Sequence, residues 1–184
     1  MNKILFLVAN GFEDVELFMP LDILMRGGVL VTLASIDDNT TVESARHVSI
    51  QTNQKLSELN LNEFSGIFLP GGGLGVENLK SSEKVLETVR YFYENKKWVT
   101  AICAAPLVLA HAGVIKSHKI TSYPSVESDL LNDCKTYSKE RVVTDSNIIT
   151  SQGPGSAEEF GFKFLELLEG NPIAEKVKAQ MICR

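Results

Sequence analysis

Cys103 is the residue best placed to do chemistry in this chain of 184 residues. It lies in the segment AICAAP (residues 101–106), between an apolar run that predicts a strand and a run that predicts a helix. Small residues two positions before and after Cys103 permit the sharp turn of a nucleophile elbow. A thiol at the start of a helix also faces unpaired N–H groups and the positive end of the helix dipole, which favour the thiolate. A buried structural cysteine explains the segment equally well, so both interpretations stay open at this point.

A glycine-rich segment, LPGGGLG (residues 69–75), follows another predicted strand. Without side chains, its backbone N–H groups can approach a substrate oxygen and stabilise negative charge there. A simple tight turn explains the same glycines, so this segment is a weak indication by itself. Because no Gly-Lys-Ser/Thr sequence follows, the segment is not a nucleotide triphosphate site.

Three acids, Glu13, Asp14 and Glu16, open a predicted helix. For Glu13 and Asp14 the simpler interpretation is favoured, in which acids of a first turn complement the helix dipole and point to solvent. Glu16 lies one turn into the helix, beside the predicted end of the sheet. There its carboxyl could hydrogen-bond Cys103, provided that burial keeps it protonated.

None of the three histidines is expected to serve Cys103 as a base. His118 lies in a polar stretch that predicts a solvated loop, and His47 lies in another polar stretch. His111 comes two helical turns after Cys103, which is about 11 Å along a helix axis and too far for a hydrogen bond. A local Cys-His pair is therefore not expected, which argues against an ordinary cysteine protease.

The composition is that of one acidic globular domain. The chain is 44% hydrophobic and 22% charged with a formal net charge of −5, which argues against disorder and against binding of a nucleic-acid backbone. No apolar run reaches membrane-spanning length, and the first residues predict a strand rather than a signal peptide. Besides Cys103, only Cys134 and Cys183 are present, in a predicted loop and tail, which is too few for a disulfide framework or a zinc site. We therefore expect reduced thiols, no metal, no membrane or nucleic-acid partner, and a cytoplasmic location.

Strand and helix patterns alternate along the whole chain. Apolar runs predict strands at residues 3–8, 30–34, 66–69, 98–102, 119–121, 142–143 and 148–151. Helical spacing predicts helices near residues 13–27, 82–95, 106–111 and 157–170, with a terminal turn or two within 173–180. The polar segment 37–53 predicts a short hairpin or an excursion at the sheet edge. This order predicts a single α/β domain over residues 1–184, with a doubly wound, mostly parallel sheet and helices on both faces. The carboxyl ends of its strands would bring the segments named above together.

With these elements in place, the chain resembles the ThiJ/PfpI superfamily, most closely the branch of the parkinsonism-associated protein deglycase and YajL. The resemblance covers nearly the whole chain and rests on four separated motifs in the right order. These are EDVE (13–16), LPGG (69–72) with LG (74–75) and NL (78–79), AICAAP (101–106), and TSQGPG (150–155) with EF (159–160).

The resemblance implies a flavodoxin-like fold, a homodimer and an activity that needs no cofactor. It makes Cys103 the reactive, readily oxidised cysteine and Glu16 the protonated acid that hydrogen-bonds it. The backbone N–H groups of Gly72 and Ala104 would bind an oxyanion. It also implies a supporting pocket that includes Asp22 as a further acid, Arg26 and Arg46 as basic residues near a dimer-related anion pocket, and Tyr123, Gly153 and Pro154.

Two departures limit the chemistry that the resemblance implies. Tyr123 stands where several relatives carry a histidine, so a histidine general base is not expected. Ala104 stands where the protease-like branch has a histidine, so peptidase activity is not expected. The expected function is that of a cysteine-dependent glyoxalase or protein deglycase, acting on the small dicarbonyl methylglyoxal or on glycated proteins under carbonyl and oxidative stress. The alternative is a redox sensor or chaperone that uses oxidation of Cys103 to a sulfinate. A weaker alternative, a role near thiamine biosynthesis, rests on the superfamily name alone.

Overall fold

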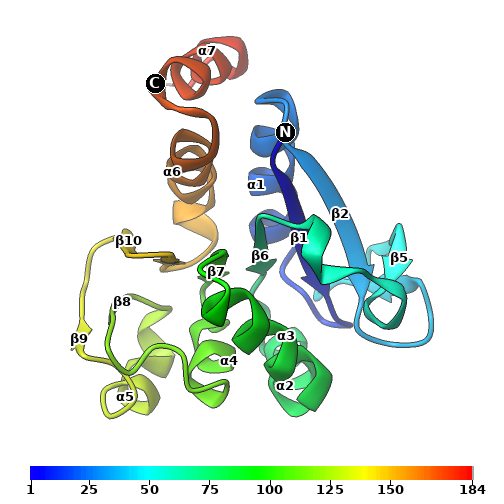
Figure 1. The fold of residues 1–184 in the computed structure, drawn as a ribbon, viewed down its shortest axis with the longest axis vertical. Helices are drawn as coiled ribbons and strands as arrows, with labels where there is room; N and C mark the ends of the chain where they lie inside the picture. The colour runs from blue at the N-terminus through cyan, green and yellow to red at the C-terminus, as the bar shows by residue number, and fades with distance from the viewer. Residues whose placement is uncertain (184) are drawn as a thin grey trace.

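A seven-stranded sheet runs through the middle of the protein, which a computed structural model describes for residues 1–183 (Figure 1). The strands lie in the order β10-β11-β7-β6-β1-β2-β5, and every neighbouring pair is parallel except β10 and β11. Their bounds are Lys3–Val8 (β1), Leu30–Ser35 (β2), Gln54–Lys55 (β5), Gly66–Leu69 (β6), Trp98–Ile102 (β7), Val142–Asp145 (β10) and Ile148–Ser151 (β11). The strand order changes direction between β1 and β6, which is where open α/β sheets form their sites.

Two short strand pairs lie outside the main sheet. Strands β3 (Thr41–Glu43) and β4 (Ser49–Gln51) form the antiparallel hairpin that the sequence predicts. Strands β8 (Lys119–Ile120) and β9 (Thr136–Tyr137) form a small parallel pair. The β3–β4 hairpin matters for the site because its residues hydrogen-bond to the loop between β1 and the first helix.

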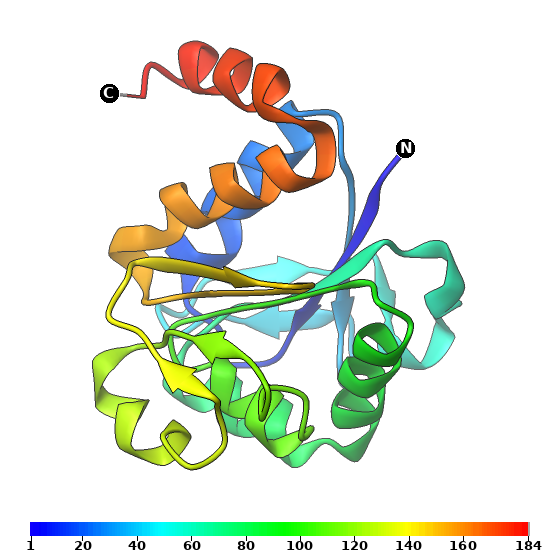
Figure 2. The same cartoon turned by 60° about the vertical axis from the view of Figure 1, so that its left-hand side comes forward.

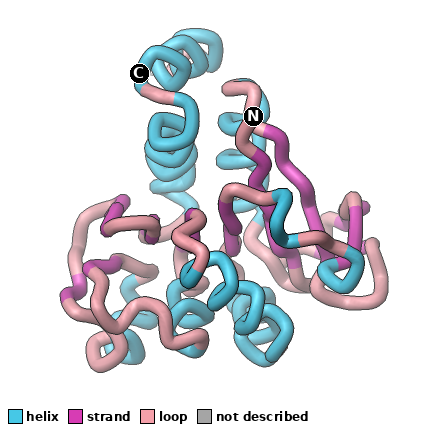
Figure 3. The backbone as a smooth tube through the Cα atoms, viewed as in Figure 1, coloured by secondary structure: helices cyan, strands magenta, loops and turns pink. Residues whose placement is uncertain are grey.

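Helices cover both faces of the sheet, as Figure 2 shows, and Figure 3 distinguishes them from the strands by colour. Helices α1 and α6 pack against each other on one face, with α7 against α6, whereas α2, α3 and α4 pack together on the opposite face. The helices are α1 (Asp14–Arg26), α2 (Gly73–Ser81), α3 (Glu83–Glu94), α4 (Pro106–His111), α5 (Glu127–Leu130), α6 (Ala157–Glu169) and α7 (Asn171–Met181). Four short 3₁₀ helices occupy Leu56–Glu58, Leu61–Glu63, Pro124–Val126 and Pro154–Ser156.

Strand β1 shows why the sheet is covered on both sides. Ile4 and Phe6 pack into the core beside α1 and α6, whereas Leu5 and Leu7 pack into the core beside α2, α3 and α4. All four side chains are completely buried. A continuous apolar run fits a parallel strand with helices on both faces, because successive side chains point to opposite sides. The predicted doubly wound α/β architecture is therefore confirmed. Within residues 1–183, no helix is both long and apolar enough to cross a membrane.

The structure corrects the sequence reading of two helices. Residues 73–81 form α2, although the glycines there predict only a turn. Gly75 is needed in this helix because a Cβ on it would lie 2.9 Å from the backbone nitrogen of Phe12. At the other end of the chain, α7 has eleven residues rather than a turn or two, since Ala174 and Val177 are buried in the core that it shares with α6.

The prediction that His118 lies in a solvated loop is wrong. Only 7% of the residue is exposed, and its Nε2 lies 3.0 Å from the hydroxyl of Tyr93 on α3. The ring also lies edge-on to the Tyr93 ring. His118 therefore joins the turn before β8 to the helical layer, a long-range contact that the local polar sequence does not reveal.

Candidate active site at Cys103

Cys103 lies in a tight turn between β7 and α4. Its φ of 66° is in the left-handed region, which is unusual for a residue other than glycine and common at functional turns. The turn is held by two backbone bonds, because Cys103 N–H donates to Ser151 O at 2.9 Å and Tyr123 N–H donates to Cys103 O at 2.8 Å. The side chain remains partly accessible. This is the geometry that the sequence predicts for a nucleophile elbow.

Glu16 is the buried acid of the site. Its side chain projects from the first turn of α1 and is 0% exposed. Gly71 N–H donates to Glu16 Oε2 at 2.9 Å, and Glu16 Oε2 and Cys103 Sγ both lie against Gly71. Burial, together with the negative charge of Glu13, outweighs the interactions with Cys103 and Gly71 and raises the pKa of Glu16 from 4.5 to about 7. Glu16 is therefore a group that can hold or release a proton near neutral pH.

The expectation that the thiolate of Cys103 is favoured is wrong for the resting site. Burial, followed by the charge of Glu16 and its hydrogen bond, raises the pKa of Cys103 to about 12. The backbone N–H groups of Ala104 and Gly72 lower the pKa of the thiol, but their effect is smaller. Because the two side chains are so close, they share one negative charge once the first proton has left. The thiol consequently needs Glu16 to take its proton.

The glycine turn after β6 packs directly on this pair. A Cβ on Gly71 would lie 2.6 Å from Cys103 Cβ and even closer to Glu16 Oε2. Gly72 has a φ of 101°, and a Cβ there would lie 2.8 Å from the backbone nitrogen of Glu13. Only glycine fits at these two positions, which explains how the Gly72 N–H reaches the sulfur.

We expect Gly71→Ala to separate Glu16 from Cys103. The new methyl group has no space, so we predict a loss of about 1–3 kcal/mol of stability. Because Glu16 raises the pKa of Cys103, moving it away should also make Cys103 react faster with iodoacetamide. Gly73→Ala is the matched control, because a Cβ on Gly73 meets no atom within 4 Å. Urea unfolding and thiol alkylation measure the two effects. Equal behaviour of the two variants would contradict the tight packing described here.

Gly153 of the expected supporting pocket lies beside Glu16. A Cβ on Gly153 would lie 3.7 Å from Glu16 Oε1 and 3.1 Å from the ring of Tyr123, so Gly153 lies between the acid and the tyrosine. Tyr123 is 45% exposed, and Pro154 begins the exposed turn that follows Gly153. Tyr123 and Pro154 therefore lie toward the solvent side of the buried acid.

Asp22 and Arg26 do not meet Cys103 within this chain. They form an exposed ion pair on α1, with Arg26 Nε 2.7 Å from Asp22 Oδ2. Asp22 comes six residues after Glu16, which is about 9 Å along the helix axis. It lines a shallow depression of about 340 Å³ whose other residues are Asp14, Val15, Phe18, Met19 and Met181. A role for Asp22 or Arg26 at the site would require a second chain.

The prediction that Glu13 and Asp14 point to solvent is wrong. The side chain of Glu13 is 16% exposed, and its Oε2 lies 3.7 Å from Nη2 of Arg46. Oδ2 of Asp14 is buried and has no hydrogen-bond partner among residues 1–183. Sequence reasoning missed the place of Glu13 because it depends on Arg46, which the β3–β4 hairpin brings from more than thirty residues away.

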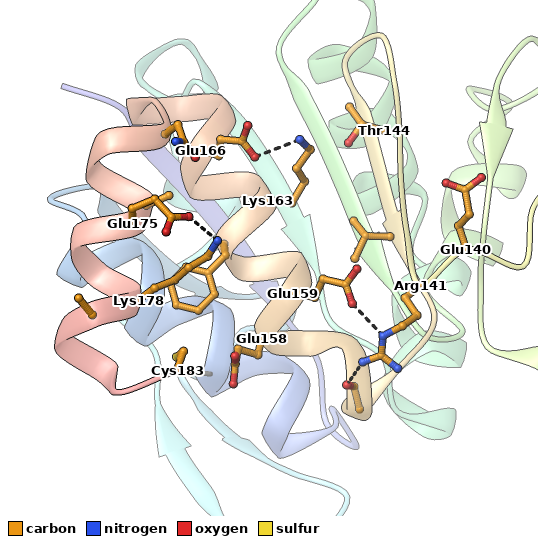
Figure 4. A pocket seen from close by; sticks show the side chains of 16 residues that line it. Glu140, Arg141, Thr144, Glu158, Glu159, Lys163, Glu166, Glu175, Lys178 and Cys183 are labelled. Carbon is orange, nitrogen blue, oxygen red and sulfur yellow. Dashed lines mark hydrogen bonds and ion pairs between the residues drawn. The ribbon is translucent and has the colours of Figure 1, made fainter.

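A separate groove of about 1090 Å³ lies between β10, α6 and α7 (Figure 4). Most of the charged side chains in it pair with one another, including Arg141 with Glu159 at 2.8 Å and Lys178 with Glu175 at 2.6 Å. Burial raises the pKa of the Cys183 thiol at its rim, and nearby Glu158 adds to this effect. Among the described residues, none that surrounds Cys103 lines this groove, so the candidate chemistry is confined to the strand ends.

The whole chain is similar in sequence and in fold to known proteins. Parkinson disease protein 7 homolog of Danio rerio is 33% identical over 185 residues, covering 100% of this chain and 98% of that protein. Deglycase PfpI of Pyrococcus furiosus is 36% identical over 168 residues, covering 91% of this chain and 99% of that protein. The crystal structure of Drosophila melanogaster DJ-1beta superposes with a TM-score of 0.96 at 34% identity, covering 100% of this chain and 98% of the other. The model of the DJ-1/PfpI family matches residues 2–167, and the chain belongs to this family.

Proposed function

We propose that this protein is a cofactor-independent glyoxalase or protein deglycase that acts on methylglyoxal or on its adducts with protein amines. The observation that carries the proposal is the pairing of a partly accessible Cys103 with a buried Glu16 whose pKa is about 7, next to two backbone N–H groups. The similarity to a deglycase of the same family supports it. Removal of reactive dicarbonyls would serve the cell under carbonyl and oxidative stress.

In the first step, the sulfur of Cys103 attacks the aldehyde carbon of methylglyoxal. The thiol proton passes to the carboxylate of Glu16 as the carbon–sulfur bond forms, so a free thiolate never has to accumulate. The carbonyl π electrons move to the oxygen, which becomes an alkoxide. The N–H groups of Gly72 and Ala104, which point at the sulfur, are placed to stabilise that charge.

In the second step, the hemithioacetal rearranges within the bound substrate. Glu16 returns its proton to the alkoxide, which gives the neutral hemithioacetal. Its carboxylate then removes the hydrogen of the former aldehyde carbon as a proton; the C–H electrons form a double bond to the neighbouring carbon, and the ketone oxygen takes the proton of the new hydroxyl. Glu16 gives its proton to that neighbouring carbon as the carbonyl re-forms on the carbon that bears the sulfur. The product is a lactoyl thioester of Cys103. Water then adds to the thioester and the carbon–sulfur bond breaks, which releases lactate and restores the thiol. The sum is methylglyoxal plus water giving lactate and a proton, with no external oxidant or reductant.

The direct test is lactate formation from methylglyoxal by purified protein without added cofactor. We expect turnover to rise as pH increases through about 7, because Glu16 then becomes the base that accepts the thiol proton. The protein must first be shown by alkylation to carry a reduced Cys103. No lactate from such a sample would overturn the proposed activity.

A second copy of the chain is the partner that we propose. Helix α1 exposes Val15 (46%), Phe18 (38%) and Met25 (57%), a set of apolar side chains that a second copy would cover. Arg26 on the same helix could then approach the site of the other chain. Sedimentation of the purified protein tests this proposal, and a monomer at micromolar concentration would contradict it.

A redox sensor or chaperone is the second candidate function. The observation that favours it is the contact between Glu16 and Cys103, since a protonated carboxyl can hydrogen-bond a sulfinate and hold oxidation at that stage. Mass spectrometry after mild peroxide treatment should then find two added oxygens on Cys103 first. Earlier oxidation of Cys134 or Cys183 would remove the basis for this function.

A further inference from the structure

Glu13 is tied by the main chain to the turn that holds Glu16. Its N–H donates to Gly71 O at 3.0 Å, while Gly71 N–H donates to Glu16 Oε2 at 2.9 Å. Glu13 also lies three residues before Glu16, a spacing that puts the two acids on neighbouring positions of a helical turn. With only 16% of the side chain exposed, water screens its charge incompletely. Gly71 therefore links the two acids, since its carbonyl oxygen bonds the backbone of Glu13 and its N–H bonds the side chain of Glu16.

The β3–β4 hairpin holds Glu13 from the other side. Ala45 N–H donates to Phe12 O at 2.8 Å, and Gly11 N–H donates to Glu43 O at 2.8 Å, so the hairpin is fixed to the loop before α1. Arg46 extends from this hairpin to Glu13 at 3.7 Å, but 71% of its side chain is exposed. An exposed guanidinium at this distance orients the Glu13 carboxylate without cancelling its charge.

Few charged or titratable groups surround Glu16. Cys103 faces it from the elbow, Glu13 approaches from the start of its own helix, and Tyr123 lies on the other side of Gly153, in the loop after β8. Of these neighbours, Glu13 raises the pKa of Glu16 by its charge, because a nearby anion disfavours a second one. Arg46 affects the protonation of Glu16 through its ion pair with Glu13.

We propose that Glu13 is a positioning residue of the site: its main chain is held by Gly71, its carboxylate is oriented by Arg46, and its charge keeps a proton on Glu16 beside Cys103. The effect of Glu13 on the protonation of Glu16 does not depend on the proposed function. Only the use of that proton in turnover rests on the proposed function. In the reaction, Glu16 must accept the thiol proton and then give it to the alkoxide. Without the charge of Glu13, Glu16 stays ionised at lower pH and becomes a weaker acid for the second of these transfers.

The test is an infrared titration of the protonated Glu16 carboxyl, whose absorption is identified by its loss in Glu16→Gln. In Glu13→Gln, which removes the charge and keeps the shape, we expect the titration midpoint to fall by roughly one pH unit, a tenfold change in the ionisation constant. Arg46→Gln should move the midpoint upward by a smaller amount, because the exposed arginine screens Glu13 only weakly. Glu43→Gln, an exposed acid on the same hairpin, is the control and should leave the midpoint unchanged.

The two proposals fail in different ways. A midpoint in Glu13→Gln equal to that of the wild type and of Glu43→Gln would overturn the role of Glu13, even if the protein makes lactate. A shifted midpoint in a protein that makes no lactate would overturn the proposed activity and leave the role of Glu13 intact. The titration reads a single carboxyl, so a merely structural effect of the substitution would not reproduce the opposite shifts of the two variants.

Discussion

Cys103→Ser should abolish lactate formation from methylglyoxal, with a fall in kcat of at least roughly 1,000-fold. The sulfur forms the bond to the aldehyde carbon, and serine at the same place is a far weaker nucleophile because its hydroxyl loses a proton much less readily. The elbow itself should survive, since the backbone bonds at residue 103 to Ser151 and Tyr123 do not involve the side chain. Lactate assays at saturating methylglyoxal, with circular dichroism to check folding, measure the effect.

The two other cysteines supply the matched controls. Cys134 and Cys183 lie outside the strand ends, and burial raises the pKa of both thiols. Cys134→Ser and Cys183→Ser should therefore keep the wild-type rate. Turnover that survives in Cys103→Ser, or that is lost in either control, would assign the chemistry to a different residue.

The elbow shows which parts of the site sequence alone can predict. The strand over residues 98–102, the helix that begins at Pro106 and the small residues around Cys103 are all local features, and the structure has them where the sequence predicts them. Continuous apolar runs predict the buried strands for the same reason. A strand that is covered on both faces is apolar at successive positions, and this pattern is visible within the strand itself. Glu16 was found from its place one turn into the first helix.

Properties that depend on distant segments could not be predicted in this way. The pKa of Cys103 follows from burial under the glycine turn and beside Glu16, which outweighs the helix N–H groups that the local sequence suggests. The position of Glu13 follows from Arg46 on a hairpin, and the burial of His118 follows from Tyr93 on another helix. The glycines of α2 predict a turn when only the local sequence is considered. Gly75 is required by the close approach of Phe12, which is a tertiary contact that the local sequence does not show.

Glu16→Gln should lower lactate formation by roughly 100-fold or more, the usual contribution of a positioned acid and base. A glutamine can still accept the hydrogen bond from Gly71 N–H through its carbonyl oxygen and donate through its amide nitrogen. It cannot take the thiol proton or return it to the alkoxide. The variant therefore removes proton transfer while it keeps the shape and the hydrogen bonds of the buried side chain.

The same substitution should make the protein more stable at neutral and alkaline pH. The folded-state pKa of Glu16 is raised from 4.5 to about 7, so its contribution to stability is complete below pH 4.5 and is lost as pH rises through about 7. Above that pH, the buried carboxylate costs the wild type about 3 kcal/mol relative to acid pH. The neutral amide of Glu16→Gln carries no such cost.

Urea unfolding at pH 4.5 and at pH 8 measures this difference. We expect the free energies of unfolding of the wild type and Glu16→Gln to be closest at the lower pH and to diverge in favour of the variant at the higher pH. Equal pH dependence of the two proteins would show that Glu16 ionises in the folded protein as it does in water. The combined result, lower activity with higher stability, is what a buried acid retained for its proton should give, because a residue retained for packing would lose stability when replaced.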